Sequence, residues 1–375
     1  MRVGVPRESA GETRVALVPD LVGKLTSLGY DVAVQSGAGE AAGHADKEYE
    51  EAGALVVDDP TEGAQVLVSI LPPPADLVST LKPETVTISF LWPIRSPELV
   101  AELRDCGVTA FAFELVPRIS RAQSMDALSS QALVSGYRCA VVAAGLLRRF
   151  FPLNMTAAGT VPPAEITVLG AGVAGLQTIA TCRRLGAVVR AYDVRAAAAE
   201  EIRSVGAQAI ELDLETLEGA GGYAREMTEG RAARQRELLA PYIAASDALI
   251  TTAAVPGRAA PLLVTADMVE AMRPGSVVVD LAAESGGNVE GSRPGQVVRI
   301  GNAQVWGGQN VPAQMPGPAS KLYAQNVVNL VTLMTADEAF APDFEDEIVR
   351  GCCVTRQGEI LHEPTRALLE GASQP

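Results

Sequence analysis

The stretch from Glu165 to Asp193 constrains the fold of this chain more than any other part of the sequence. It begins with the apolar, strand-like run Ile166 to Leu169, and the turn Gly170-Ala171-Gly172-Val173-Ala174-Gly175 follows directly. A helical pattern comes next, and a second strand-like run, Val188 to Tyr192, ends at Asp193. A strand, a G-x-G-x-x-G turn, a helix and a second strand in this order predict the βαβ unit of a Rossmann-type domain.

The three glycines of this turn have separate expected roles. Gly170 allows the tight turn, Gly172 lets a pyrophosphate approach the backbone, and Gly175 lets the helix pack closely on the strand. Free N–H groups at the start of the helix, at Val173 and Ala174, favour an anion. We therefore predict that a dinucleotide contacts this turn, and a flavin or an empty fold of the same type is the alternative.

An acidic residue stands where the second strand ends. A carboxylate at Asp193 can accept hydrogen bonds from ribose hydroxyls, and it repels the 2′-phosphate of NADP(H). Val194 and Arg195 follow directly and are included in the predicted cofactor site. The expected cofactor is therefore NAD(H), and the expected chemistry is hydride transfer.

The length and charge of the chain narrow the classes of protein further. At 375 residues it suits two domains, and 48% hydrophobic with 20% charged residues is typical of a globular α/β protein. The formal charge of −15 argues against nucleic-acid binding, because phosphate groups require a positive field. The cysteines and histidines show no metal-ligand spacing, so we expect no metal site and a reducing compartment.

The sequence shows no pattern of a membrane or secreted protein. Its N-terminus lacks the features of a secretory signal. The longest apolar runs, Ala140 to Leu147 and Val327 to Met334, are much shorter than the ~20 residues that cross a bilayer. We therefore expect a cytoplasmic protein without a membrane-spanning segment.

Strand-like and helix-like segments alternate along both halves of the chain. This alternation predicts an α/β fold with two Rossmann-like, doubly wound parallel-sheet domains joined by long helices. We place the first domain at residues 1–130 with 318–375 and the second at residues 138–317, and we expect a loop from Ala157 to Pro163. The predicted strands are Arg2 to Pro6, Asp31 to Val34, Val66 to Ile70, Val86 to Phe90, Thr109 to Phe113, Ile166 to Leu169, Val188 to Tyr192, Gln208 to Ile210, Ala248 to Thr251, Ser276 to Asp280 and Gln304 to Trp306.

The segment Arg118-Ile119-Ser120-Arg121-Ala122-Gln123-Ser124-Met125-Asp126-Ala127-Leu128-Ser129-Ser130-Gln131 resembles the signature of the NAD(H)-binding alpha subunit of proton-translocating NAD(P) transhydrogenase. The resemblance is nearly chain-long, and alanine dehydrogenase shares the same scaffold. It implies that Arg118, Gln123, Asp126 and Ser129 surround the nicotinamide. The alternative for Asp126 and Ser129 is that they only cap the helix that follows.

The same resemblance implies further cofactor contacts in the second domain. Tyr223 and Met227 lie in a Gly-rich segment that is similar to the family's mobile loop, and Ala253 follows a strand at the predicted site. Glu284 and Asn310 also follow predicted strands at the carboxyl edge of the sheet, where ligands bind in such folds. We treat these last two as candidate lining residues.

Two missing side chains distinguish the transhydrogenase resemblance from the alanine dehydrogenase one. Alanine dehydrogenases are expected to hold the amino acid with a lysine and a histidine, and those places read Ser69-Ile70-Leu71-Pro72-Pro73 and Ile88-Ser89-Phe90-Leu91-Trp92 here. Oxidising an amino acid requires an acid/base group, whereas hydride exchange between two nicotinamides requires only positioning and charge stabilisation. Arg14 matches an arginine that meets the substrate carboxylate in alanine dehydrogenases, and we expect it to serve the fold.

The resemblance implies an NAD(P)⁺ transhydrogenase component of the proton-translocating, Si/Re-specific class. NADP(H) is expected on a partner subunit, proton passage in membrane-spanning partners, and this chain on the inner face of the membrane as a homodimer. An alanine-type dehydrogenase with another acid/base and a non-catalytic NAD(H) sensor are the alternative functions.

Overall fold

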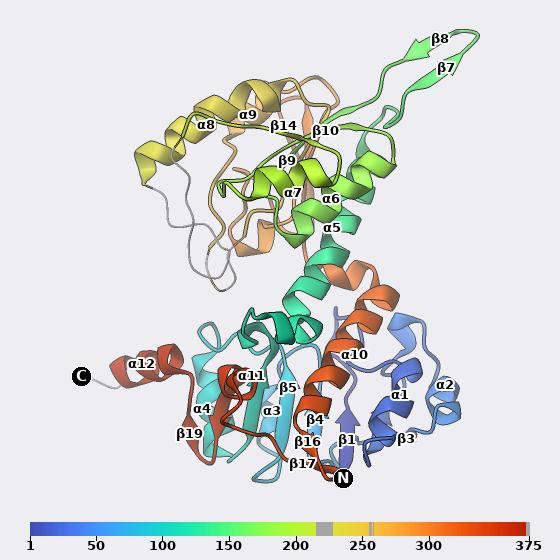
Figure 1. The fold of residues 1–375 in the computed structure, drawn as a ribbon, viewed down its shortest axis with the longest axis vertical. Helices are drawn as coiled ribbons and strands as arrows, with labels where there is room; N and C mark the ends of the chain where they lie inside the picture. Colours follow the sequence, from blue (N-terminus) through green and yellow to red (C-terminus); the bar gives the residue numbers. More distant parts are fainter. Residues whose placement is uncertain (215–227, 255–256, 258, 373–375) are drawn as a thin grey trace. The chain divides into compact units, whose positions relative to one another are not determined.

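The computed structural model describes residues 1–214, 228–254, 257 and 259–372. The chain forms two compact units, which are described separately below (Figure 1). Unit 1 contains residues 1–131 and 313–375, and unit 2 contains residues 132–312. The helix α5, Ala127–Leu146, begins in unit 1 and ends in unit 2. The two parallel-sheet units confirm the predicted fold class.

Unit 1 is built on an eight-stranded sheet with the order β19-β18-β6-β5-β4-β1-β2-β3. The six strands from β6 to β3 are parallel, whereas β18 pairs antiparallel with β6, and β19 antiparallel with β18. The strands are β1 (Arg2–Val5), β2 (Asp31–Gln35), β3 (Leu55–Val57), β4 (Val66–Val68), β5 (Val86–Ser89), β6 (Thr109–Ala112), β18 (Cys353–Arg356) and β19 (Glu359–Ile360).

Helices bury apolar side chains on the sheet of unit 1. The longest that lies wholly in this unit, α10 (Pro316–Leu333), places Tyr323, Val327 and Leu330 in the core and contacts α1. The other helical segments are α1 (Pro19–Thr26), η1 (Glu40–Ala42), α2 (Asp46–Glu51), α3 (Ala75–Val78), α4 (Pro97–Asp105), η2 (Phe113–Leu115), η3 (Ser120–Met125), α11 (Glu347–Cys352) and α12 (Glu363–Ala372), with the short pair β16 (Thr335–Ala336) and β17 (Ala339–Phe340).

Unit 2 has a seven-stranded sheet with the order β11-β10-β9-β12-β13-β15-β14. All neighbouring strands are parallel except β14 and β15. The strand order reverses between β9 and β12, and ligands bind at such a switch point in doubly wound folds. The strands are β9 (Glu165–Leu169), β10 (Val188–Tyr192), β11 (Gln208–Ala209), β12 (Ala248–Thr251), β13 (Val277–Asp280), β14 (Val297–Ile300) and β15 (Ala303–Gly307).

Apart from the end of α5, the helices of unit 2 follow its strands along the chain, because parallel strands require long crossover connections. They are α6 (Val173–Arg184), α7 (Ala198–Ser204), α8 (Glu229–Ala244), α9 (Ala266–Glu270), η5 (Ala283–Ser285) and η6 (Val311–Gln314), the last of which reaches the unit boundary. Within the stretches of chain that the structure describes, no helix combines the length and apolar character needed to span a membrane.

Several elements differ from the sequence-based expectation. The predicted loop from Ala157 to Pro163 is wrong in part, because Gly159–Val161 forms strand β8 and pairs with β7 (Asn154–Thr156) in a projecting hairpin (Figure 1). The edge strands β3, β14 and β19, and β18 beside β19, are not among the predicted strands. β3 and β19 are only three and two residues long and β14 is partly exposed, whereas β18 is largely buried but ends in the polar residues Thr355 and Arg356. None of the four has the long apolar run that marks a central parallel strand.

Candidate functional site

The turn after β9 has the backbone that its first glycine permits. Gly170 has φ +98°, which is costly for other residues. A Cβ on Gly170 would lie 2.8 Å from Thr252 Oγ1, and the Thr252 hydroxyl donates to the Gly170 carbonyl over 3.1 Å. The turn is therefore packed against the segment that follows β12.

The other two glycines differ in what surrounds them. A Cβ on Gly175 would lie 2.0 Å from the Gly170 carbonyl oxygen, so helix α6 can approach the turn only with glycine there. Gly172 has no neighbour within 4 Å of such a Cβ, and it stands before the first residue of α6 without a side-chain cap. Open space in front of uncapped helix N–H groups at Val173 and Ala174 fits the pyrophosphate of a dinucleotide.

Asp193 lies at the end of β10, and its carboxylate is already engaged by protein groups. Oδ2 accepts the N–H of Ala171 at 2.7 Å, and Oδ1 accepts the backbone N–H and Nε of Arg195 at 2.9 and 3.0 Å. Arg195 also donates to the Ala171 carbonyl at 3.2 Å, and its hydrogen bond with Asp193 raises the pKa of the guanidinium. Val194 packs on the apolar core beside them. Arg195 thus links the acid to the glycine turn.

A buried carboxylate that the sequence analysis missed organises the neighbouring loops. Asp280, at the end of β13, accepts N–H groups of Ala282, Asn288 and Val289 and the hydroxyl of Thr251. Asn288 in turn donates from Nδ2 to the Ala253 carbonyl at 2.8 Å. The buried side chains of Asp280 and Asn288 together therefore fix the position of Ala253. In the sequence, the signal for this arrangement is an acid at the end of a strand, followed by Gly286-Gly287-Asn288.

The two candidate lining residues of unit 2 are joined directly. Glu284, in η5, accepts the backbone N–H of Asn310 at 2.8 Å, and Asn310 has φ +37°. Both follow strands at the carboxyl edge of the sheet. Tyr223 and Met227 lie outside the described residues.

In unit 1, the residues predicted at the nicotinamide occupy one continuous segment. Asp126 accepts the N–H of Ser129 at 2.9 Å and its hydroxyl at 2.6 Å, so the carboxylate caps the first turn of α5. Arg118 and Gln123 are exposed on the preceding segment, and Gln123 lies in η3. Asp126 therefore caps α5, and the side chains of Arg118 and Gln123 are exposed on the segment that precedes it.

Two half-buried glutamates hold the loops that follow β4 and β5. Glu8 accepts the N–H groups of Ile70 and Leu71, and Glu114 accepts those of Leu91 and Trp92. Burial raises the pKa of each carboxyl to about 7, although these backbone hydrogen bonds act in the opposite direction. These loops carry parts of the segments Ser69 to Pro73 and Ile88 to Trp92, in which alanine dehydrogenases are expected to have a lysine and a histidine.

Arg14 lies in the buried interior of unit 1. Its guanidinium forms a two-point ion pair with Glu12, at 2.8 and 2.7 Å, and donates to Gln131 Oε1 at 2.9 Å. The side chain is 6% exposed. These contacts agree with a role in stabilising the fold.

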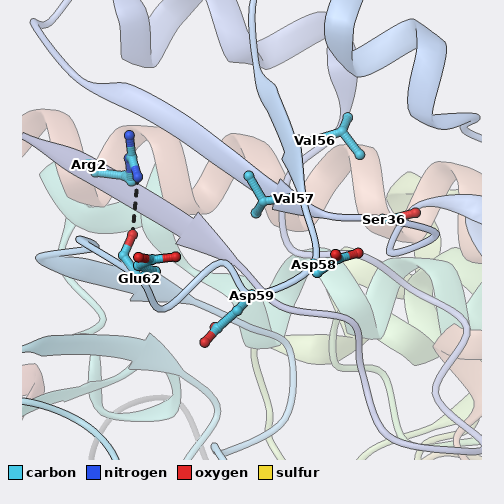
Figure 2. Close-up of a pocket in the computed structure, with 7 residues that line it drawn as sticks. All are labelled: Arg2, Ser36, Val56, Val57, Asp58, Asp59 and Glu62. Carbon is cyan, nitrogen blue, oxygen red and sulfur yellow. Dashed lines mark hydrogen bonds between the residues drawn. The ribbon is translucent and has the colours of Figure 1, made fainter.

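A groove in unit 1 lies apart from these residues, over the edge strand β3. Figure 2 shows it lined by Arg2, Ser36, Val56, Val57, Asp58, Asp59 and Glu62, and Arg2 donates to the Glu62 carbonyl at 3.1 Å. None of the predicted site residues lines this groove. Among the described residues, no group of three or more His, Cys, Asp or Glu side chains could hold a metal ion.

Comparison with known proteins decides the family. The description "Alanine dehydrogenase/PNT, N-terminal domain" matches residues 4–135, and "Alanine dehydrogenase/PNT, C-terminal domain" matches residues 139–363. The chain belongs to the alanine dehydrogenase/PNT family. The resemblance inferred from the segment between Arg118 and Gln131 is thereby confirmed.

Within this family the chain is more similar to transhydrogenase components than to alanine dehydrogenase. It is 42% identical to NAD(P) transhydrogenase subunit alpha of Haemophilus influenzae, over 100% of this chain and 74% of that one. It superposes on a transhydrogenase structure from Sinorhizobium meliloti with a TM-score of 0.85 and 42% identity, over 96% and 99% of the two chains. Identity to alanine dehydrogenase of Bacillus subtilis is 30%, over 77% and 72%.

Proposed function

We propose that this chain is the NAD(H)-binding component of a proton-translocating NAD(P) transhydrogenase. The observation that carries the proposal is the turn from Gly170 to Gly175, with open space at Gly172 and an acid at Asp193, in a chain whose whole length is similar to transhydrogenase subunits. Bound NADH would supply the hydride, and NADP⁺ on a partner subunit would receive it with Si/Re specificity.

The residues of unit 2 are proposed to hold the adenosine and pyrophosphate portions of the cofactor. The N–H groups of Val173 and Ala174 face the phosphates, and Asp193, with Val194 and Arg195 beside it, accepts the ribose hydroxyls. Tyr223 and Ala253 are proposed as further contacts, and Glu284 and Asn310 as lining residues. Arg195 must exchange part of its bonding to Asp193 when a ribose binds, because the two compete for Oδ1.

The exposed segment of unit 1 is proposed to hold the nicotinamide end. Gln123 and Arg118 can hydrogen-bond the carboxamide and a ribose or phosphate oxygen, and Asp126 can stabilise positive charge that develops on the ring. Ser129 supports Asp126 through its hydroxyl. Transfer between two nicotinamides moves no proton at carbon, and the segments Ser69 to Pro73 and Ile88 to Trp92 contain no lysine or histidine for amino-acid oxidation.

The proposed partners follow from the same function. NADP(H) and the proton pathway are assigned to other subunits, and the chain is proposed to lie on the inner face of the membrane through them.

We also propose a homodimer, supported by apolar side chains on and beside the β7–β8 hairpin. Phe150, Leu153 and Met155 are 57, 53 and 73% exposed, and contiguous exposed apolar surface favours association.

Reconstitution of the chain with membrane and NADP(H)-binding transhydrogenase subunits tests the function. NADH-dependent reduction of NADP⁺ that requires this chain is the expected result. NADH formation from L-alanine and NAD⁺ by the chain alone would instead support an alanine-type dehydrogenase. NADH binding without any transfer in the complete system would support a sensor.

A further inference from the structure

A buried asparagine on α10 binds the segment that carries the proposed nicotinamide residues. Asn326 is 6% exposed, and its Nδ2 donates to the Ser124 carbonyl at 2.8 Å. Its Oδ1 accepts the hydroxyl of Ser130 at 2.7 Å. The two contacts span about 200 positions in sequence, so tertiary packing alone brings them together.

The orientation of the Asn326 amide is fixed by its partners. A backbone carbonyl can only accept, so the amide nitrogen must face Ser124 and the amide oxygen must face Ser130. Ser130 also accepts a hydrogen bond from Gln131 Nε2 at 3.2 Å, and Gln131 accepts one from Arg14. A connected buried network of this kind stabilises one arrangement of its members.

The two contacts of Asn326 lie on either side of the proposed nicotinamide residues Asp126 and Ser129. Ser124 lies between Gln123 and Asp126, and Ser130 directly follows Ser129. Asn326 therefore ties the segment before α5 to the first turn of α5. Asn329, one turn further along α10, is half-buried and donates to the same Ser124 carbonyl at 2.9 Å, but its Oδ1 accepts from Gln325 on its own helix.

We propose that Asn326 is a positioning residue that sets the placement of Gln123, Asp126 and Ser129 against the nicotinamide. This inference rests on the proposed function. It assigns to α10 a direct influence on the reacting end of the cofactor, although Asn326 itself does not touch the cofactor. Small displacements of positioning groups slow a reaction strongly while leaving distant binding contacts intact.

Asn326→Asp is the informative variant, because it preserves the shape of the side chain and the bond from Ser130. A carboxylate oxygen then faces the Ser124 carbonyl, and this repulsion displaces the segment. We expect the affinity for ADP-ribose, which lacks nicotinamide, to stay within about twofold of the wild type. The preference for NADH over ADP-ribose should fall by about threefold or more, and hydride transfer in the reconstituted system by about tenfold or more.

Two further variants keep the test decisive. Asn329→Ala removes a bond to the same carbonyl at a more exposed place, and it should leave the NADH preference near the wild-type value. If Asn326→Asp does not fold, Ser130→Ala is used in its place. It should cause the same loss of preference for NADH over ADP-ribose.

Two results would overturn the proposal. One is an unchanged preference for NADH with unchanged transfer, and the other is equal weakening of ADP-ribose and NADH together with a lower Tm, which indicates a merely structural role. Because ligand binding is measured on the chain alone, a failure of wild-type transhydrogenation would reject the proposed function without deciding the role of Asn326.

Discussion

The carboxylate of Asp126 accepts two hydrogen bonds from Ser129, one from its backbone N–H at 2.9 Å and one from its hydroxyl at 2.6 Å. The pair therefore begins helix α5, and the proposed role at the nicotinamide is additional to that capping role. Substitutions can separate the two roles, because asparagine caps a helix as well as aspartate does but carries no charge.

Asp126→Asn should leave the free energy of unfolding nearly unchanged and slow hydride transfer by about tenfold or more, because the charge proposed to stabilise the ring is lost. Asp126→Ala should also lower the free energy of unfolding by about 1 kcal/mol, since the cap is removed. Denaturant unfolding and transfer rates in the reconstituted system measure these effects. An unchanged rate in Asp126→Asn would remove the residue from the nicotinamide site.

Gly172 and Gly175 form a matched pair for the dinucleotide turn. Gly172→Ala should fold normally, since no atom lies within 4 Å of the added Cβ, but NADH affinity should fall by about tenfold, because the methyl group occupies the space proposed for the pyrophosphate. Gly175→Ala should instead lower the free energy of unfolding by about 1–3 kcal/mol, because its Cβ meets the Gly170 carbonyl. Calorimetric titration and thermal unfolding distinguish them, and full NADH affinity in a folded Gly172→Ala variant would contradict the placement.

Asp193 should determine the choice between NADH and NADPH. Asp193→Ala is expected to weaken NADH binding by about tenfold or more and to strengthen NADPH binding, because the guanidinium of Arg195 loses its 3.0 Å partner and can meet a 2′-phosphate. The double variant with Arg195→Ala is the control and should bind both nucleotides weakly. Equal wild-type affinity for NADH and NADPH would refute the proposed role of this acid.

The half-buried carboxyls of Glu8 and Glu114 should make stability depend on pH. Burial raises the pKa of each from 4.5 to about 7 in the folded protein, so the folded state keeps protons that the unfolded chain has released. The protonated carboxyls contribute fully to the free energy of unfolding below about pH 4.5. As the pH rises through 7 this contribution is lost, and the loss reaches up to about 3 kcal/mol for each group.

Comparison of the wild type with Glu114→Gln from pH 4.5 to 8 measures this contribution. The unfolding free energy of the wild type should fall relative to that of Glu114→Gln as the pH rises through this window. Groups with a lowered pKa, such as Asp346, are present in both proteins and cancel in the comparison. A difference that is constant with pH would contradict the buried-carboxyl account.

The β7–β8 hairpin should carry the self-association. Met155→Glu places a charge on a side chain that is 73% exposed, and it is expected to shift the protein from dimer to monomer in light scattering after gel filtration. Leu368→Glu, on an exposed apolar residue of α12, is the matched control and should remain dimeric. A dimeric Met155→Glu variant would exclude the hairpin as the interface.

The sequence by itself determined the central strands of both sheets and the glycine turn. Those features are local: apolar runs such as Val188 to Tyr192 must be buried, and the positive φ of Gly170 is open to few residues other than glycine. The capping of α5 by Asp126 is local as well, since its partner lies three residues away. Preferences for burial, for backbone conformation and for helix capping act within a few residues, so the local sequence pattern is enough to predict them.

Only the tertiary structure decided the contacts that join distant segments. Nothing near Asn326 indicates that it binds Ser124, and nothing near Glu8 indicates that it holds Ile70 and Leu71. The antiparallel strand β18 joins the sheet for the same kind of reason, because its partner β6 lies far away in sequence. Such pairings depend on which surfaces remain after the core has packed, and a single polar residue in the sequence does not specify its distant partner.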